Sequence, residues 1–351
     1  MLEFFIAFIG VLVLVAMLIP LSYRVGLLDH PDNERKQHKG AVPLIGGIAM
    51  FASVALAALF FVPPSNEMSF LLTGCALLTM TGTLDDRYHL HYGVRLLIQG
   101  LAGCLLVWGS QSELSSLGNL FGTGDITLLW LSIPVTIIAV IALINAFNMI
   151  DGIDGLAGGL SLISSLTLYL LIHSTTSEGA NGILLLLMGA LLAYLILNLH
   201  LIPKLTPKIF MGDAGSMVLG FIITAFLIRY TQGRKELFAP TTALWVVAIP
   251  LMDIVATTIR RLVRRRNPFK PDRTHIHHIL LKAGLSQRSS LVFILMAQLI
   301  LSGVGLALEK NQAPHWLSFA LFLAIFFFYF QLLKHAFFTS KWLRRFIRST
   351  H

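Results

Sequence analysis

The sequence predicts an all-α polytopic membrane protein with about eleven transmembrane helices, an outside N-terminus and a cytoplasmic C-terminus. Three observations carry this expectation: the scarcity of charge, the apolar segments and the placement of the basic residues. Hydrophobic residues make up 56% of the 351-residue chain and charged residues only 12%, whereas a soluble domain carries about 25% charged residues. No soluble domain or internal repeat is evident, so we expect one integral-membrane domain over residues 1–351.

Eleven apolar segments come close to the roughly 20 residues that a helix needs to cross the hydrocarbon core. They occupy residues 2–22, 44–62, 68–84, 94–109, 128–146, 157–173, 183–199, 215–230, 240–259, 290–308 and 315–333. The spans thus extend over about 2–333, and a basic tail, 334–351, follows. Several segments are short, which predicts that their cytoplasmic ends border a protein-lined cavity. The first is not a cleavable signal, because it carries Glu3 and is followed by Tyr23-Arg24.

The lysines and arginines set the orientation, because they concentrate on the cytoplasmic side of membrane proteins. With the N-terminus outside, all but four of the 26 fall on the inner side; the four are Arg229, Arg234, Lys235 and Lys310. Ten of the 17 acidic residues lie on that same side. The net charge of +9 therefore indicates topology and contact with anionic membrane lipids, and no nucleic-acid partner is expected. We expect a multi-pass protein of the cell inner membrane whose active site faces the cytoplasm.

The first inner loop combines basic side chains with a double glycine. Arg35, Lys36 and Lys39 are suited to binding phosphate. Gly46-Gly47 would let the backbone approach a ligand or a neighbouring helix closely. The alternative is an ordinary positive-inside loop with a tight start to the next helix.

Asp85 and Asp86 stand at the end of the third apolar segment. Adjacent carboxylates at that position repel each other and oppose the negative pole of the helix dipole. A divalent cation is the usual compensation. Solvated acids beside Arg87 are the alternative interpretation.

Asn145, Asn148, Asp151 and Asp154 recur every third residue at the end of the fifth segment. That spacing drifts slowly around an α-helix and aligns on a 3₁₀ turn. We therefore expect all four side chains to face one cavity, because a plain turn needs no such register.

Asp213 lies between two glycines in the sequence Phe210-Met-Gly-Asp-Ala-Gly-Ser, and Asn198 precedes it at the end of the seventh segment. The glycines admit a pyrophosphate while the carboxylate holds a cation. The alternative is that Asp213 is merely a helix N-cap.

The longest inner loop ends in His275-Ile-His277-His278 after a run of arginines. It lacks the glutamate and the spacing of an HExxH zinc site, so imidazoles that donate to phosphate oxygens are the better interpretation. A bland basic loop explains the arginines but not the histidines. Asp253, inside the ninth segment, is either functional or a structural partner of an arginine, serine or threonine.

These motifs together place oxygen ligands for Mg²⁺, phosphate donors and amides on one face of an apolar bundle. That combination predicts phosphoryl transfer to or from a lipid. Their order also resembles the polyprenyl-phosphate N-acetylhexosamine-1-phosphate transferases, of which the WecA branch is the most similar and MraY a relative. The resemblance covers about residues 20–330.

The resemblance implies transfer of N-acetylglucosamine-1-phosphate from UDP-GlcNAc to undecaprenyl phosphate, with release of UMP, to initiate O-antigen or common-antigen type polysaccharides. It implies Mg²⁺, with Mn²⁺ able to substitute, and a homodimer is compatible with the sequence. The metal ligands expected are Asp213 and Asp86. The catalytic set expected is Asp85, Asp86, Asp151, Asp154 and His278. The substrate contacts expected are Lys39, Arg95, Asn145, Asn148, Asn198, Phe210, His275 and His277, with Asp154, Phe210 and Asn198 around the uridine.

One position departs from the family pattern. Many relatives carry a third acid three residues after the aspartate pair, and this chain has His89 there. We expect direct attack of the lipid phosphate on the sugar-linked phosphorus; a covalent aspartyl-phosphate route uses the same residues. The alternatives are another UDP-N-acetyl sugar, UDP-MurNAc-pentapeptide, or, in a different class, a lipid-linked transporter or flippase, which would favour inverted repeats and helices broken at the midplane.

Overall fold

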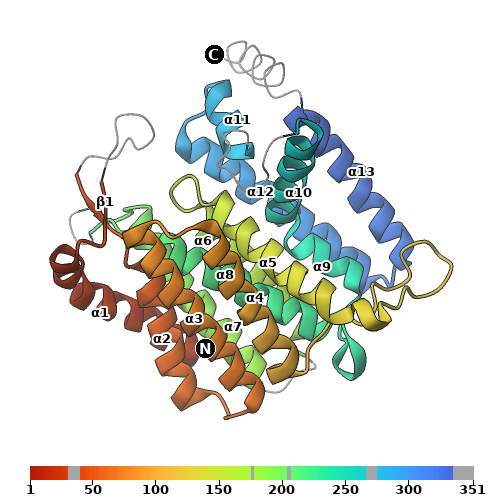
Figure 1. Ribbon diagram of the computed structural model, residues 1–351, viewed down its shortest axis with the longest axis horizontal. Coiled ribbons are helices and arrows are strands. Elements are labelled where there is room, and N and C mark those ends of the chain that lie inside the picture. The colour runs from red at the N-terminus through yellow and green to blue at the C-terminus, as the bar shows by residue number, and fades with distance from the viewer. Residues whose placement is uncertain (31–39, 175–177, 204–206, 266–274, 335–351) are drawn as a thin grey trace.

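The computed structural model describes residues 1–30, 40–174, 178–203, 207–265 and 275–334, and in these ranges the chain is a helical bundle (Figure 1). The helices are α1 (Leu2–Val25), α2 (Gly46–Phe61), α3 (Asn66–Tyr88), α4 (Tyr92–Ser110), α5 (Ser132–Ile150), α6 (Leu156–Ile172), α7 (Glu178–Asn198), α8 (Gly212–Tyr230), α9 (Pro240–Val246), α10 (Ala248–Val263), α11 (Ile276–Ala283), α12 (Gln287–Lys310) and α13 (His315–Lys334), with short 3₁₀ turns η1 (Leu129–Leu131) and η2 (Gly233–Lys235). The expected all-α class is confirmed.

Fewer helices are long enough to cross a membrane than the eleven that the sequence predicts. Each of the eleven apolar segments is helical, but within the described ranges only eight helices are long and apolar enough to cross a membrane. Helices α2 and α6 fall short, with 16 and 17 residues. A count of eleven crossings therefore stays a prediction.

The expected span 240–259 is not one straight helix. It consists of α9 and α10, which meet at Val247 with a bend of 88°. Gln298 of α12 satisfies the backbone freed by this break: its Oε1 accepts the Ile249 N–H at 2.8 Å, and its Nε2 donates to the Trp245 and Val246 carbonyls at 3.1 Å. A buried break is tolerated because a neighbouring side chain replaces the lost helical hydrogen bonds.

Helix α8 forms the centre of the bundle. Its side chains from Ala214 to Ile228 are all buried, and it contacts α2, α3, α5 and α6. The peripheral helices expose large apolar side chains instead, such as Leu97, Ile138 and Phe328, as expected for surfaces that face lipid.

Glycines bring the backbones of α2 and α3 against the start of α8. A Cβ atom at Gly47 would lie 2.2 Å from the Gly215 nitrogen, and one at Gly82 would lie 2.3 Å from the Ala214 nitrogen. No larger side chain fits at such distances. The double glycine of the first loop therefore serves helix–helix packing.

The chain segment before α8 is pinned by backbone hydrogen bonds. The short strands β1 (Leu28–Asp29) and β2 (Val42–Pro43) pair antiparallel. Phe210 donates its N–H to the Pro43 carbonyl at 2.9 Å, and its carbonyl accepts the Gly46 N–H at 2.9 Å. Strand β2, the start of α2 and the segment before α8 are thus fixed together.

Candidate active site

Three aspartates from two helices meet where α3 ends and α8 begins. The Asp213 backbone N–H donates to Asp86 Oδ1 at 2.9 Å. Arg95, in the first turn of α4, donates from Nη1 to Asp85 Oδ2 and, at 3.2 Å, to Asp213 Oδ2. The compensation expected for the adjacent carboxylates is thus partly supplied by protein: an arginine for Asp85, and the positive end of α8 for Asp86.

Glycines create this meeting point. Gly82 precedes Asp85 by three residues, so the close approach of α3 to α8 brings the carboxylates up to the first turn of α8. Gly212 has φ +71, and a Cβ atom there would lie 2.3 Å from Asp86 Oδ2. The glycine before Asp213 is therefore needed for its backbone conformation and for the space above it.

Asp213 belongs to the first turn of α8 and is not its N-cap, which is Met211. Asn148 fixes its carboxylate, since Nδ2 donates to Asp213 Oδ1 at 2.8 Å and to Ser216 Oγ at 3.0 Å. About a third of the Asp213 side chain (32%) stays accessible, against 6% for Asp85. Asp213 is thus oriented by its neighbours and still open to a ligand.

The amide and acid motif of α5 does not form a 3₁₀ turn. The α-helix runs regularly to Ile150, and the four side chains have different partners. Asn145 Nδ2 donates to Gln99 Oε1 at 2.6 Å, whereas Asn148 points at Asp213. Asn145 and Asn148 therefore do not share one partner, because a period of three drifts around a regular helix. That all four side chains face one cavity stays a prediction.

Asp151 and Asp154 lie in the turn that follows α5. Burial raises the pKa of Asp151 to about 7, with the charges of Asp213 and Asp154 acting in the same direction. Asp154 forms a 2.6 Å ion pair with Lys208, whose Nζ lies 5.1 Å from the centre of the Phe210 ring. An acid, a cation and an aromatic face are thereby grouped beside the aspartate cluster.

Asn198 has both ends of its amide engaged. Its Oδ1 accepts the Gly155 N–H at 2.6 Å, and its Nδ2 donates to the Ile209 carbonyl at 2.9 Å. The side chain is 2% exposed. Asn198 therefore holds the Asp154 turn next to the Phe210 segment, and its expected contact with uridine stays a prediction.

The histidine motif forms the start of α11 and packs against the Asp151–Asp154 turn. His277 is buried, and its Nε2 would lie 2.1 Å from a Cβ atom at Gly152. The His275 and His277 rings are parallel within 3° at a centroid distance of 5.9 Å, and the His278 ring lies 4.2 Å from that of His277. Burial lowers the pKa of His277 to about 3, so its ring is neutral at neutral pH.

The donor set of the cluster fits Mg²⁺. Asp86 Oδ2 is buried and has no hydrogen-bond partner in the described structure, and the Asp213 carboxylate is accessible. No group of three or more acid, histidine or cysteine side chains converges on one point among the described residues. Mg²⁺ does not require such a cage, since it usually binds one or two carboxylates together with phosphates and water.

Comparisons with known proteins identify relatives of this chain. The family described as Glycosyl transferase family 4 matches residues 68–231. Undecaprenyl-phosphate alpha-N-acetylglucosaminyl 1-phosphate transferases of Salmonella typhi and Escherichia coli (strain K12) are 36% and 38% identical over 329 residues, which is 93% of this chain and 88% of each relative. The transferase of that name from Haemophilus influenzae is 36% identical over 345 residues, 98% of this chain and 97% of the relative. The chain belongs to this family.

The family match covers the aspartates, the amides, Arg95 and Phe210, whereas Asp253 and the histidines of α11 lie beyond its end. Lys39 lies outside the described residues. His89, the departure from the family pattern, ends α3 in the left-handed region at φ 53, with its N–H on the Asp85 carbonyl. The imidazole thus occupies a helix-ending position.

Four residues that contact the expected site residues or Asp253 were absent from the set expected from sequence: Gln99, Lys208, Ser216 and Tyr329. Two of them carried a usable signal. Gln99 follows Arg95 by one helical turn, and Lys208 precedes Phe210 by two residues. Tyr329 gave none, because its partner Asp253 is 76 residues away.

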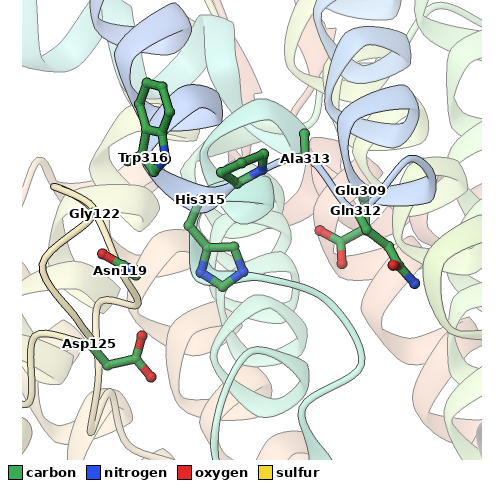
Figure 2. A pocket seen from close by; sticks show the side chains of 9 residues that line it. Asn119, Gly122, Asp125, Glu309, Gln312, Ala313, His315 and Trp316 are labelled. Carbon is green, nitrogen blue, oxygen red and sulfur yellow. The ribbon is translucent and has the colours of Figure 1, made fainter.

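A cavity of about 560 Å³ lies between the loop that follows α4 and the turn that joins α12 to α13, at the end of the bundle away from the aspartate cluster (Figure 2). Asp125, Glu309, His315 and Trp316 line it, and none of the expected site residues does. It is therefore separate from the aspartate cluster.

Proposed function

We propose that this protein transfers N-acetylglucosamine-1-phosphate from UDP-GlcNAc to undecaprenyl phosphate and releases UMP. The observation that carries the proposal is the cluster of Asp85, Asp86 and Asp213 around Arg95. Relatives named for this reaction match nearly the whole chain. The reaction joins two anionic phosphate groups, so it needs positive charge and oxygen ligands at one point.

Asp213 and the unpartnered Oδ2 of Asp86 are the atoms that would hold Mg²⁺. When bound, the cation would neutralise the pyrophosphate of UDP-GlcNAc; Mn²⁺ provides similar chemistry. Asn148 fixes the orientation of the Asp213 carboxylate. Arg95 would donate from its guanidinium to a phosphate oxygen of the substrate. The ion pair of Arg95 with Asp85 keeps that guanidinium in place before substrate arrives.

The reaction balances as one displacement. A lipid-phosphate oxygen forms a bond to the sugar-linked phosphorus, and the bond from that phosphorus to the bridging oxygen breaks. UMP leaves with the bridging oxygen and its electron pair. The lipid phosphate attacks in its fully deprotonated form, so no side chain has to take up a proton, and Asp86 Oδ2 remains available to the cation. Direct attack is favoured over an aspartyl-phosphate at Asp85, whose carboxylate is tied to Arg95.

Phe210, Asp154 and Lys208 are proposed to receive the uridine end. The Phe210 ring offers an aromatic face for uracil, and the Lys208 ammonium lies beside both it and the Asp154 carboxylate. His278 and its neighbours on α11 are proposed to face the phosphates or the sugar.

The proposed topology has eleven crossings, the N-terminus outside and the aspartate cluster at the cytoplasmic face of the inner membrane. The broken span α9–α10 and the two short helices would count as crossings in this arrangement. The product would begin a cell-surface polysaccharide, and a homodimer is the proposed assembly.

The test is UMP release by purified protein in detergent with undecaprenyl phosphate and a panel of UDP-sugars. We expect release with UDP-GlcNAc, full loss on adding EDTA, and recovery with Mg²⁺ or Mn²⁺ but not with Zn²⁺. Faster turnover of UDP-MurNAc-pentapeptide or of another UDP-sugar would reassign the donor. UMP release that persists without any divalent ion would refute the metal-binding role of Asp213 and Asp86.

A further inference from the structure

A buried carboxylate on α10 binds three donors from two separate parts of the chain. Asp253 Oδ2 accepts from His275 Nδ1 at 2.6 Å, and Oδ1 accepts from the Ile276 N–H at 3.1 Å and the Tyr329 hydroxyl at 2.6 Å. The side chains of Asp253 and His275 are 2% and 4% exposed. A buried charge is costly unless such donors satisfy it, so this arrangement is a built feature of the fold.

The three donors connect the broken span, the histidine helix and the last span. Asp253 stands on α10, Tyr329 on α13, and the His275–Ile276 segment opens α11. Helices α10 and α13 lie side by side in Figure 1 and contact each other. The start of α11 is therefore anchored to both.

The anchor also fixes the chemistry of His275. A carboxylate can only accept, so His275 Nδ1 must carry the hydrogen that it shares with Asp253. This leaves Nε2 as the nitrogen that responds to a ligand. A carboxylate on one ring nitrogen commonly fixes the tautomer and the orientation of a functional imidazole.

The anchored imidazole is two contacts from the reactive centre. His275 stacks parallel to His277, and His277 packs against Gly152. Gly152 lies between Asp151 and Asp154, whose turn borders the aspartate cluster. A displacement of the first turn of α11 would thus be passed directly to this turn.

We propose that Asp253, supported by Tyr329, is a positioning residue that sets the α11 histidines against the Asp151–Asp154 turn. This inference rests on the proposed function, because the histidines matter only if that turn and α11 enclose a phosphate-bearing substrate. Asp253 touches no reacting atom in this arrangement and acts through His275. The sequence offered an arginine, serine or threonine as its structural partner; the structure replaces these with a histidine and a tyrosine.

The Asp253→Asn substitution removes the anchor at constant size. An amide has one accepting oxygen and one donating nitrogen, so it cannot accept from His275 on one side and from Ile276 and Tyr329 on the other. Losing an orienting partner of this kind typically lowers activity about 10- to 100-fold. We expect Asp253→Asn to lower kcat by about that factor, and Tyr329→Phe, which removes one of three donors, to lower it less.

The decisive readout is a double-mutant cycle in kcat. If Asp253 acts through His275, the pair Asp253→Asn and His275→Ala will be no worse than the more damaging single variant. Penalties that multiply would show that Asp253 acts elsewhere and would overturn the proposal, as would a wild-type kcat for Asp253→Asn. If Asp253→Asn does not fold, the same cycle is run with Tyr329→Phe.

Ser318→Ala is the matched control. It breaks a buried hydrogen bond of 3.0 Å from Trp245 Nε1, which also ties α13 to the broken span but without α11. We expect it to leave kcat unchanged. An equal loss in Ser318→Ala and Asp253→Asn would reduce the effect to general packing and overturn the proposal.

Amide hydrogen exchange tests the positioning without any turnover. In Asp253→Asn we expect faster exchange in α11 and in the turn at residues 151–155, and unchanged exchange in α1. Unchanged exchange at the turn would contradict the proposal. If wild-type protein released no UMP, the proposed function would fail, whereas this exchange measurement would still decide whether Asp253 positions α11.

Discussion

At the scale of single residues, the three aspartates of the cluster are not equivalent. Asp85 is buried and paired with Arg95, Asp86 caps the start of α8 through one oxygen only, and Asp213 is held by Asn148 yet accessible. Their surroundings therefore differ. Asp85 is paired with the Arg95 guanidinium, whereas Asp86 Oδ2 has no hydrogen-bond partner in the described structure and the Asp213 carboxylate stays accessible.

Asp213→Asn and Asp86→Asn are predicted to abolish most transfer activity. Each removes an anionic oxygen from the proposed cation site, and a loss of about 3 kcal/mol of transition-state stabilisation lowers the rate about 10²-fold. UMP release at saturating Mg²⁺ measures this. Asp125→Asn, in the cavity at the opposite end of the bundle, is the control and should behave as wild type. Near-normal turnover of Asp213→Asn at low Mg²⁺ would remove Asp213 from the site.

His277 is predicted to make the folded protein sensitive to acid. Its folded pKa of about 3 lies below the unfolded value of about 6.5. Below pH 6.5 the imidazole is protonated in the unfolded chain but stays neutral in the folded chain. The free energy of unfolding is therefore highest above pH 6.5 and falls as the pH drops towards 3. The cost is about 1.4 kcal/mol at pH 5.5.

The measurement is the thermal midpoint in detergent between pH 8 and pH 5, for wild type and His277→Gln. Glutamine does not titrate, so the wild-type midpoint should fall relative to the variant only below about pH 6.5. Parallel curves over the whole range would show that His277 is protonated as readily in the folded protein as in the unfolded chain.

At the scale of helices, the site depends on how closely α3 approaches α8. Gly82 permits that approach, and the Asp85–Asp86 pair follows it on the next turn. The helices meet through backbone atoms, so a clash at this contact cannot be relieved by a change of side-chain rotamer. The position of the carboxylates is thus set by packing as much as by their own contacts.

Gly82→Ala is predicted to damage both folding and catalysis. The added Cβ would lie 2.3 Å from the Ala214 nitrogen, so α3 must shift, and overpacking of this kind costs about 1–3 kcal/mol. Displaced carboxylates should lower UMP release at least about tenfold. Gly303→Ala on α12 is the matched control, since no atom lies within 4 Å of its added Cβ. A fully active, stable Gly82→Ala would show that the close approach is dispensable.

At the scale of the whole molecule, the helices were largely predictable from the sequence, because a helix that crosses the lipid bilayer needs a long apolar segment. The α9–α10 break was missed, since residues 240–259 are mostly apolar despite Asp253, and the groups that satisfy the break belong to Gln298. In the candidate site, the meeting of Asp85, Asp86 and Asp213 agrees with their motifs, while their catalytic and metal-binding roles stay predictions. The pairing of site acids with Arg95 and Lys208 was not predictable, because packing brings these residues together.

The orientation is predicted from the same global pattern. Cysteine labelling in a variant without Cys75 and Cys104 tests it with two exposed positions, Arg264→Cys and Thr123→Cys. An impermeant maleimide added to intact spheroplasts should label position 123 and not position 264. Strong labelling at position 264 before lysis would place the basic loop, and the aspartate cluster with it, outside.

In the assigned reaction, a phosphorus atom moves together with the sugar. UDP-GlcNAc labelled with ³²P in the sugar-linked phosphate tests it most directly, with undecaprenyl phosphate as acceptor and Asp213→Asn as the inactive control. We expect the label to enter the lipid fraction together with GlcNAc and the released UMP to be unlabelled. Labelled UDP in the aqueous phase, with sugar alone on the lipid, would contradict the assignment as a sugar-1-phosphate transferase.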